Sequence, residues 1–89
     1  MTGTLPTEVG LLTNIREMFV SINKFSGTVP SEVGRMTSLV DFEGNTNDFT
    51  GVIDDRICEL GMESFVMDCI FKSSPIATFV TCGCCTRCL

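Results

Sequence analysis

Apolar positions recur with a 24-residue period along the first two thirds of the chain. Residues 2–25, TGTLPTEVGLLTNIREMFVSINKF, align without a gap with residues 26–49, SGTVPSEVGRMTSLVDFEGNTNDF. Residues 50–60, TGVIDDRICEL, begin a third copy. Self-similarity at a fixed period of this length is the signature of repeat architectures, in which each unit buries its apolar face against the next.

Each unit contains a short stretch in which apolar and other positions alternate. The first unit carries M-x-V and the second carries F-x-G, and this alternation predicts short strands near residues 17–21 and 41–45. A third strand is expected at Met62-x-x-Phe65-x-Met67. That assignment requires one residue to be deleted from the repeat after residue 60.

An Asn and a Phe follow each of the first two predicted strands. The side chains of Asn23 and Asn47 have donors and an acceptor, and we expect them to satisfy backbone groups from one unit to the next. Phe25 and Phe49 follow two residues later. Their rings should lie in a column inside the fold.

The units then continue through a Gly and Pro turn. Gly27 and Gly51 indicate positions where a positive φ or a close approach excludes a side chain. Pro6 and Pro30 each precede a short helical turn. Asp54 replaces this Pro in the third unit, where we expect a looser turn.

The combined pattern resembles the plant-type leucine-rich repeat, L-x-x-L-x-L-x-x-N-x-L-S-G-x-I-P-x-x-L-G-x-L. The resemblance is strong over residues 2–60 and loose over residues 60–70. Gly44 departs from it where the family has Leu, so we expect the core to be underpacked at this position, a thin spot. The residues that match the family's fixed positions are Ile15, Met18, Val20, Asn23, Phe25, Gly27, Val29, Pro30, Val33, Gly34 and Met36.

The resemblance implies a fold class, an α/β-type repeat solenoid. Short parallel strands would line its concave face, with turns and short helical turns on the convex side. Residues 1–60 would form the repeats, as units 2–25, 26–49 and a partial unit 50–70. Residues 61–89 would form the last strand and a Cys-rich C-terminal cap.

All six cysteines lie in the last third of the chain. A cap needs covalent support because a short tail buries little surface, and family members often end in such a cap. Disulfides are therefore favoured, with the pairing left open, and they indicate an extracellular or cell-surface protein. A zinc site at C-x-C-C-x-x-C is the rival interpretation. The disulfide candidates are Cys58, Cys69, Cys82, Cys84, Cys85 and Cys88.

Composition excludes several functions. The net charge is −5, which disfavours a nucleic-acid partner, and no apolar run is long enough to span a membrane. The chain has no His, so Ser-His-Asp and Cys-His catalysis is excluded. We expect neither an enzyme nor a cofactor, and no metal site outside the rival cysteine interpretation.

In this repeat class the variable strand positions point out of the concave face. Here they mix carboxylates with apolar groups, which suits a protein or peptide ligand that carries basic groups beside an apolar anchor. The alternative is a purely structural cap of a longer protein. The candidate binding residues are Arg16, Glu17, Phe19, Val40, Asp41, Glu43, Glu63, Val66 and Asp68.

The start of the sequence lacks the features of a signal peptide and of a polar repeat cap. The sequence therefore indicates a fragment, the C-terminal end of a longer protein. We also expect self-association through the uncapped N-terminal end, where Leu5, Val9 and Leu12 would be exposed.

Overall fold

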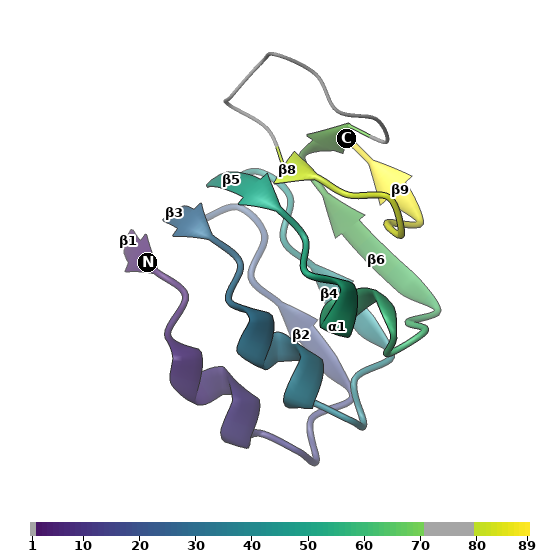
Figure 1. Ribbon diagram of the computed structural model, residues 1–89. Helices are drawn as coiled ribbons and strands as arrows, with labels where there is room; N and C mark the ends of the chain where they lie inside the picture. Colours follow the sequence, from purple (N-terminus) through teal and green to yellow (C-terminus); the bar gives the residue numbers. More distant parts are fainter. Residues whose placement is uncertain (1, 71–79) are drawn as a thin grey trace.

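A computed structural model describes residues 2–70 and 80–89, and its strands form two all-parallel sheets (Figure 1). The four-stranded sheet has the order β2-β4-β6-β9, with bounds Glu17–Phe19, Asp41–Glu43, Ser64–Met67 and Arg87–Cys88. The five-stranded sheet has the order β1-β3-β5-β8-β7, with bounds Thr2–Thr4, Lys24–Thr28, Asp48–Val52, Val80–Thr81 and Cys69–Ile70.

Helical structure in the described residues is brief. Two segments, η1 (Thr7–Leu11) and η2 (Ser31–Arg35), are 3-10 helices that begin after Pro6 and Pro30. The third, α1, is a single α-helical turn, Asp55–Cys58. Its N-cap is Asp54, whose Oδ1 accepts a hydrogen bond of 2.8 Å from the backbone N–H of Arg56. The expected looser turn in the third unit is therefore wrong, because a capping carboxylate replaces the proline.

The repeat fixes the register of the four-stranded sheet. Met18 pairs with Phe42, which lies 24 residues later, as the repeat predicts. Phe42 pairs with Phe65, which lies one residue short of a full period. The third strand and the single-residue deletion before it are thus confirmed.

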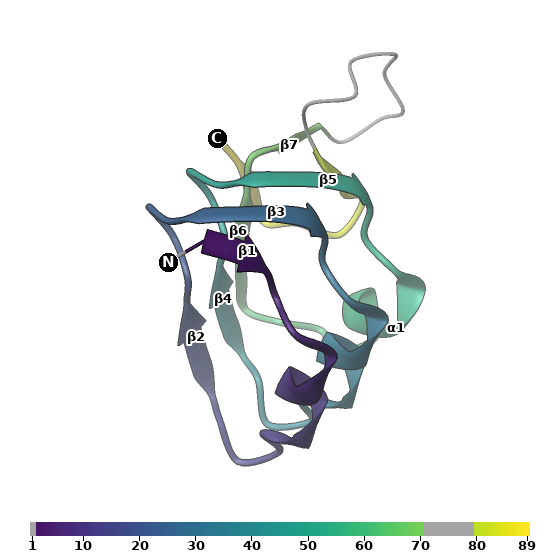
Figure 2. The same ribbon diagram turned by 90° about the vertical axis from the view of Figure 1, so that its left-hand side faces the viewer.

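The expected fold class, an α/β-type repeat solenoid, is wrong. The side opposite the predicted strands carries a second parallel sheet, β1-β3-β5-β8-β7, and not only turns and helical turns. The chain forms a compact two-sheet body of 35 × 26 × 18 Å, and residues 2–70 and 80–89 contain very little helix. Figure 2 shows the two sheets and the helical segments enclosing one interior.

The second sheet runs through residues that a sequence pattern assigns to turns. β3 and β5 each contain a glycine with positive φ, Gly27 at 76° and Gly51 at 88°. A Cβ on Gly51 would lie 2.9 Å from Cγ2 of Thr28 on the neighbouring strand. Glycine in these strands therefore serves both the backbone conformation and the close approach of strands.

Aromatic rings and an amide hold neighbouring units together. Phe25 and Phe49 stack with ring centroids 6.0 Å apart, which confirms the predicted column. Asn47 links two units as expected, because its Oδ1 accepts from the backbone N–H of Phe25 and its Nδ2 donates to the carbonyl of Val20. These bonds satisfy backbone groups that the sheets leave without partners.

The core is well packed at Gly44, where an underpacked region was expected. Gly44 is buried, and a Cβ on it would lie 2.6 Å from Sδ of Met67 and 2.8 Å from Cε1 of Phe42. Both neighbours are themselves fully buried. The flexible thioether of Met67 fills the volume that a larger residue at position 44 would occupy, so the expectation is wrong.

Two disulfides fasten the C-terminal segment to the repeats, and a third closes a loop within the segment. Cys58 of α1 bonds to Cys84, Cys69 of β7 bonds to Cys88 of β9, and Cys82 bonds to Cys85 within the segment. No cysteine is free. The predicted involvement of all six cysteines in disulfides is confirmed.

Candidate functional site

The register of the four-stranded sheet arranges most of the predicted binding residues in rows across one face. Alternate residues of a strand point to opposite sides of a sheet. Phe42 and Phe65, which pair with each other, point to the buried side, and the residues next to them in sequence point to the outer side. The first row is Arg16, Val40 and Glu63, the second is Glu17, Asp41 and Ser64, and the third is Phe19, Glu43 and Val66.

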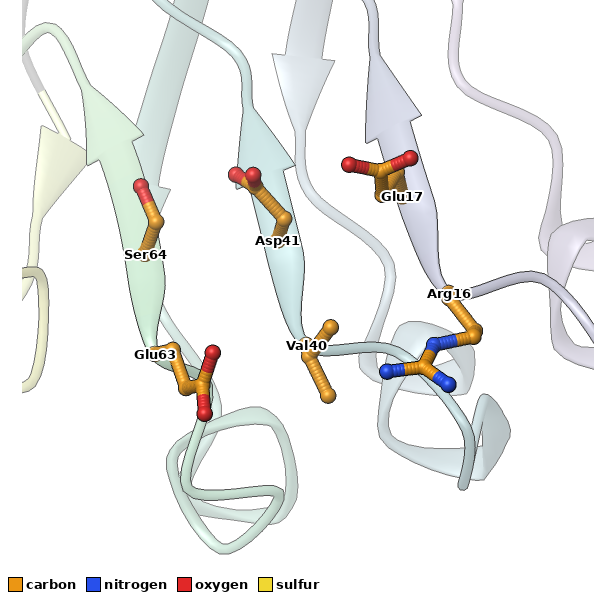
Figure 3. Close-up of a pocket in the computed structure, with 6 residues that line it drawn as sticks. All are labelled: Arg16, Glu17, Val40, Asp41, Glu63 and Ser64. Carbon is orange, nitrogen blue, oxygen red and sulfur yellow. The ribbon is translucent and has the colours of Figure 1, made fainter.

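The first two rows line a shallow pocket with a volume of about 420 Å³ (Figure 3). The backbone sets its geometry, because the carbonyl of Arg16 accepts from the N–H groups of both Val40 and Asp41. The carbonyl of Val40 accepts in the same way from Glu63 and Ser64. Figure 3 shows Val40 between Arg16 and Glu63, so an apolar surface separates a cation from a carboxylate.

Asp41 occupies the centre of this pocket and has one unsatisfied oxygen. Its Oδ1 is inaccessible to solvent and has no hydrogen-bond partner among the described residues. A buried carboxylate oxygen without a donor carries a desolvation cost. Glu17 and Glu63 on the adjacent strands add two further carboxylates to the pocket.

The third row combines an apolar end with charged groups. Phe19 is 56% exposed, although large aromatic side chains are usually covered. Glu43 and Val66 beside it are half-buried. Val66 pairs in turn with Arg87 of β9, so a cation completes the row.

Arg87 is the residue of this face that the sequence pattern does not assign. It belongs to the cysteine-rich tail, outside the repeat, and no periodicity predicts its register. Only the pairing of β6 with β9 brings it beside Val66. The sequence offers no signal for this contact, because the pairing of the cysteines is open at that level and the Cys69–Cys88 disulfide that joins the two segments is a finding of the structure.

Asp68 lies apart from the pocket. Its Oδ2 accepts a hydrogen bond of 3.1 Å from the backbone N–H of Asn47, and its carbonyl accepts from the N–H of Val80. Both bonds connect the third unit to its neighbours. Asp68 thus supports the fold, in the same way that Asn47 supports the preceding unit.

The disulfides bear directly on the rival zinc interpretation. All six sulfurs are bonded to one another, so no thiolate is left to hold a metal. Among residues 2–70 and 80–89, no group of three or more potential ligands is placed to hold a metal ion. Over the same residues, no helix has the length and hydrophobicity needed to span a membrane.

Comparison with known proteins adds no family assignment: no protein-family model matches the chain, and no curated protein is significantly similar to it.

Proposed function

We propose that this chain binds a protein or peptide ligand, without catalysis, through the outer face of the sheet β2-β4-β6-β9. The ligand presents a basic side chain to the pocket around Asp41 and an apolar group to Phe19. The observation that carries the proposal is the pocket itself, which the carboxylates of Glu17, Asp41 and Glu63 line together.

Physical chemistry favours a cationic ligand group. An ammonium or guanidinium donates several hydrogen bonds, and Lys and Arg also carry an aliphatic stem that can lie against Val40. The net charge of −5 favours the approach of a basic partner. Arg16 and Arg87 at the margins of the face would oppose ligands with a second cation at those points.

The repeat pattern supports a wider proposal about the protein. The chain belongs to an extracellular protein with leucine-rich repeats, and its cysteine-rich segment covers the third unit. Three disulfides are compatible with an extracellular protein. The tail also has a structural role of its own, since β9 pairs with β6 and the side chains of Cys82 and Cys85 are buried.

Selection from a displayed peptide library, with the oxidised chain as bait, tests this function. Selected peptides should be enriched in Lys or Arg next to an aromatic or aliphatic residue. Asp41→Asn should weaken their binding about tenfold, because it removes the charge that pairs with the ligand. Phe19→Ala should weaken it to a similar degree by removing the apolar contact.

The matched control is Asp48→Asn. This substitution removes the same charge from an exposed position on β5, in the other sheet. It should leave the affinity unchanged. Equal losses for Asp41→Asn and Asp48→Asn would mean that the peptides respond only to net charge, and selection without basic residues would contradict the proposal.

A further inference from the structure

Arg87 reaches the outer face of the four-stranded sheet from the cysteine-rich tail, and its backbone is fixed on both sides. Before it, Oγ1 of Thr86 accepts a hydrogen bond of 2.8 Å from the N–H of Phe65, and the N–H of Thr86 donates to the carbonyl of Phe65 at 2.9 Å. After it, Cys88 is disulfide-bonded to the buried Cys69. A cation whose neighbours are held in this way is preorganised, so a ligand pays little to order it.

Register and alternation direct the side chain of Arg87 outward. Arg87 pairs with the half-buried Val66, and Cys88 pairs with Met67, whose side chain is fully buried. Neighbouring residues of a strand point to opposite sides, so Cys88 takes the inner side and Arg87 takes the outer side, where it is exposed. The guanidinium is therefore presented to a ligand on this face.

Two rows of the face have the same composition in opposite order. From β2 toward β9, the first row runs cation, valine, carboxylate, and the third row contains carboxylate, valine, cation: Arg16, Val40 and Glu63, then Glu43, Val66 and Arg87. Arg16 lines the same pocket as three carboxylates, whereas Arg87 does not line it. Arg87 also forms no ion pair with any of residues 2–70 and 80–89. Its charge is thus left for a group of the ligand.

We propose that Arg87 binds a carboxylate of the ligand, so that the face recognises a peptide with a basic and an acidic group at a fixed separation. This inference rests on the proposed function, in which a basic side chain enters the pocket around Asp41. Two strand spacings and two residues along a strand separate Asp41 from Arg87, which places their Cα atoms about 12 Å apart. An extended peptide covers about 13 Å in four residues, and alternation places both of its charged side chains on the same side.

The chemistry of arginine suits this role. Its planar guanidinium donates two parallel hydrogen bonds to a carboxylate, which gives direction as well as charge. The peptide between the two charged groups crosses β6 between Ser64 and Val66, where an apolar side chain can pack against Val66. A ligand with basic groups alone would bring a second cation toward Arg87 or leave its charge without a partner.

Titration calorimetry of the oxidised full chain with two synthetic peptides tests this subsite. Both are heptapeptides with blocked termini, Lys at position 2 and Val at position 4, and they differ only in having Glu or Gln at position 6. The Glu peptide should bind about tenfold more tightly, and Arg87→Gln should abolish this difference. The control Arg56→Gln removes the same charge from an exposed position on α1 and should preserve the difference.

A third peptide distinguishes the two sources of the carboxylate. It has Gln at position 6 and ends there with a free C-terminal carboxylate. Weaker binding of this peptide to Arg87→Gln than to the unmodified chain would assign the subsite to a chain terminus. An effect of Arg87→Gln on the Glu peptide alone would assign it to an acidic side chain.

Equal affinities of the Glu peptide and both Gln peptides for the unmodified chain would overturn the subsite, and this comparison does not depend on a variant folding. The same loss of preference in Arg87→Gln and Arg56→Gln would also overturn it. The proposed function fails on a different result, namely binding of the blocked Gln peptide that Asp41→Asn leaves unchanged. A chain that binds none of the peptides would contradict both.

Discussion

The two ends of the four-stranded sheet differ in whether their apolar surface is covered. At the C-terminal end, a segment with little regular structure is joined to the repeats by two disulfides, contains a third, and adds β8 and β9 to the two sheets. At the N-terminal end, β2 is an open edge beside exposed Leu12 and Ile15. In the described residues, the apolar surface of the repeats is thus covered at one end of the sheet and exposed at the other.

Removal of the Cys58–Cys84 disulfide should have the largest effect. The two residues are 26 apart in sequence, and the loop-entropy relation gives a loss of about 3.5 kcal/mol for Cys58→Ala with Cys84→Ala. Urea denaturation of the oxidised double variant measures this loss. The Cys82–Cys85 bridge spans only 3 residues, so its removal should cost about 2 kcal/mol. Equal losses would show that chain entropy does not set the contribution of the bridges.

The next largest loss of stability should distinguish a buried position of the repeat from the equivalent position that is exposed in the first unit. Leu39→Ala should lower the free energy of unfolding by about 3 kcal/mol, because it leaves a cavity among buried side chains. Ile15→Ala, its equivalent one period earlier, should cost about 1 kcal/mol in the monomer. Denaturation at low protein concentration gives both values, and similar values would mean that the N-terminal edge is as well packed as the interior.

The smallest effect concerns the backbone of the first unit. Ile22 has φ of 56°, a left-handed conformation that disfavours β-branched residues, and its side chain is exposed. Ile22→Gly should therefore stabilise the monomer by about 1 kcal/mol. Ile22→Ala retains Cβ and should bring no such gain. A stabilising alanine would point to the exposed side chain, and not the backbone, as the source of the cost.

Sequence periodicity was sufficient to predict one of the two sheets. The strands at residues 17–19 and 41–43 lie within the predicted ranges, and the third follows the predicted deletion. Alternation of apolar and polar residues shows which side chains of a strand are buried. It predicts these strands because only one of their two sides is buried. The buried Phe42 and Phe65 rings, with centroids 5.6 Å apart, are the packing that this pattern requires.

The second sheet was missed for a physical reason. β3 and β5 contain Ser-Gly-Thr and Thr-Gly-Val, and glycine is depleted in strands because it lacks a side chain to pack. Their stability comes from pairing with the same segment of the neighbouring unit and from bonds such as that of the Asn47 amide to the N–H of Phe25. Such long-range pairing leaves no local pattern of alternation in the sequence.

The candidate site was predictable as far as the repeat extends. A shift of 24 residues preserves the position of a residue on its strand, and for this reason six of the predicted residues lie side by side in the three rows. They are Arg16 and Val40, Glu17 and Asp41, and Phe19 and Glu43. Asp68 differs because it follows β6 at the point where the chain leaves the repeat, and there its carboxylate meets the backbone of Asn47. Arg87 lies beyond any repeat and depends on the tail for its position.

The fit of Met67 against Gly44 constrains how this sequence can change over time. Alanine at position 44 collides with the sulfur of Met67, while a smaller residue at position 67 alone leaves an empty volume. Each single step is unfavourable, and the two changes together restore the filling of the core once the Phe42 ring, 2.8 Å from the new Cβ, shifts as well. Residues 44 and 67 should therefore be inherited as a pair, and a lineage that acquires leucine at the first position should already carry a smaller residue at the second.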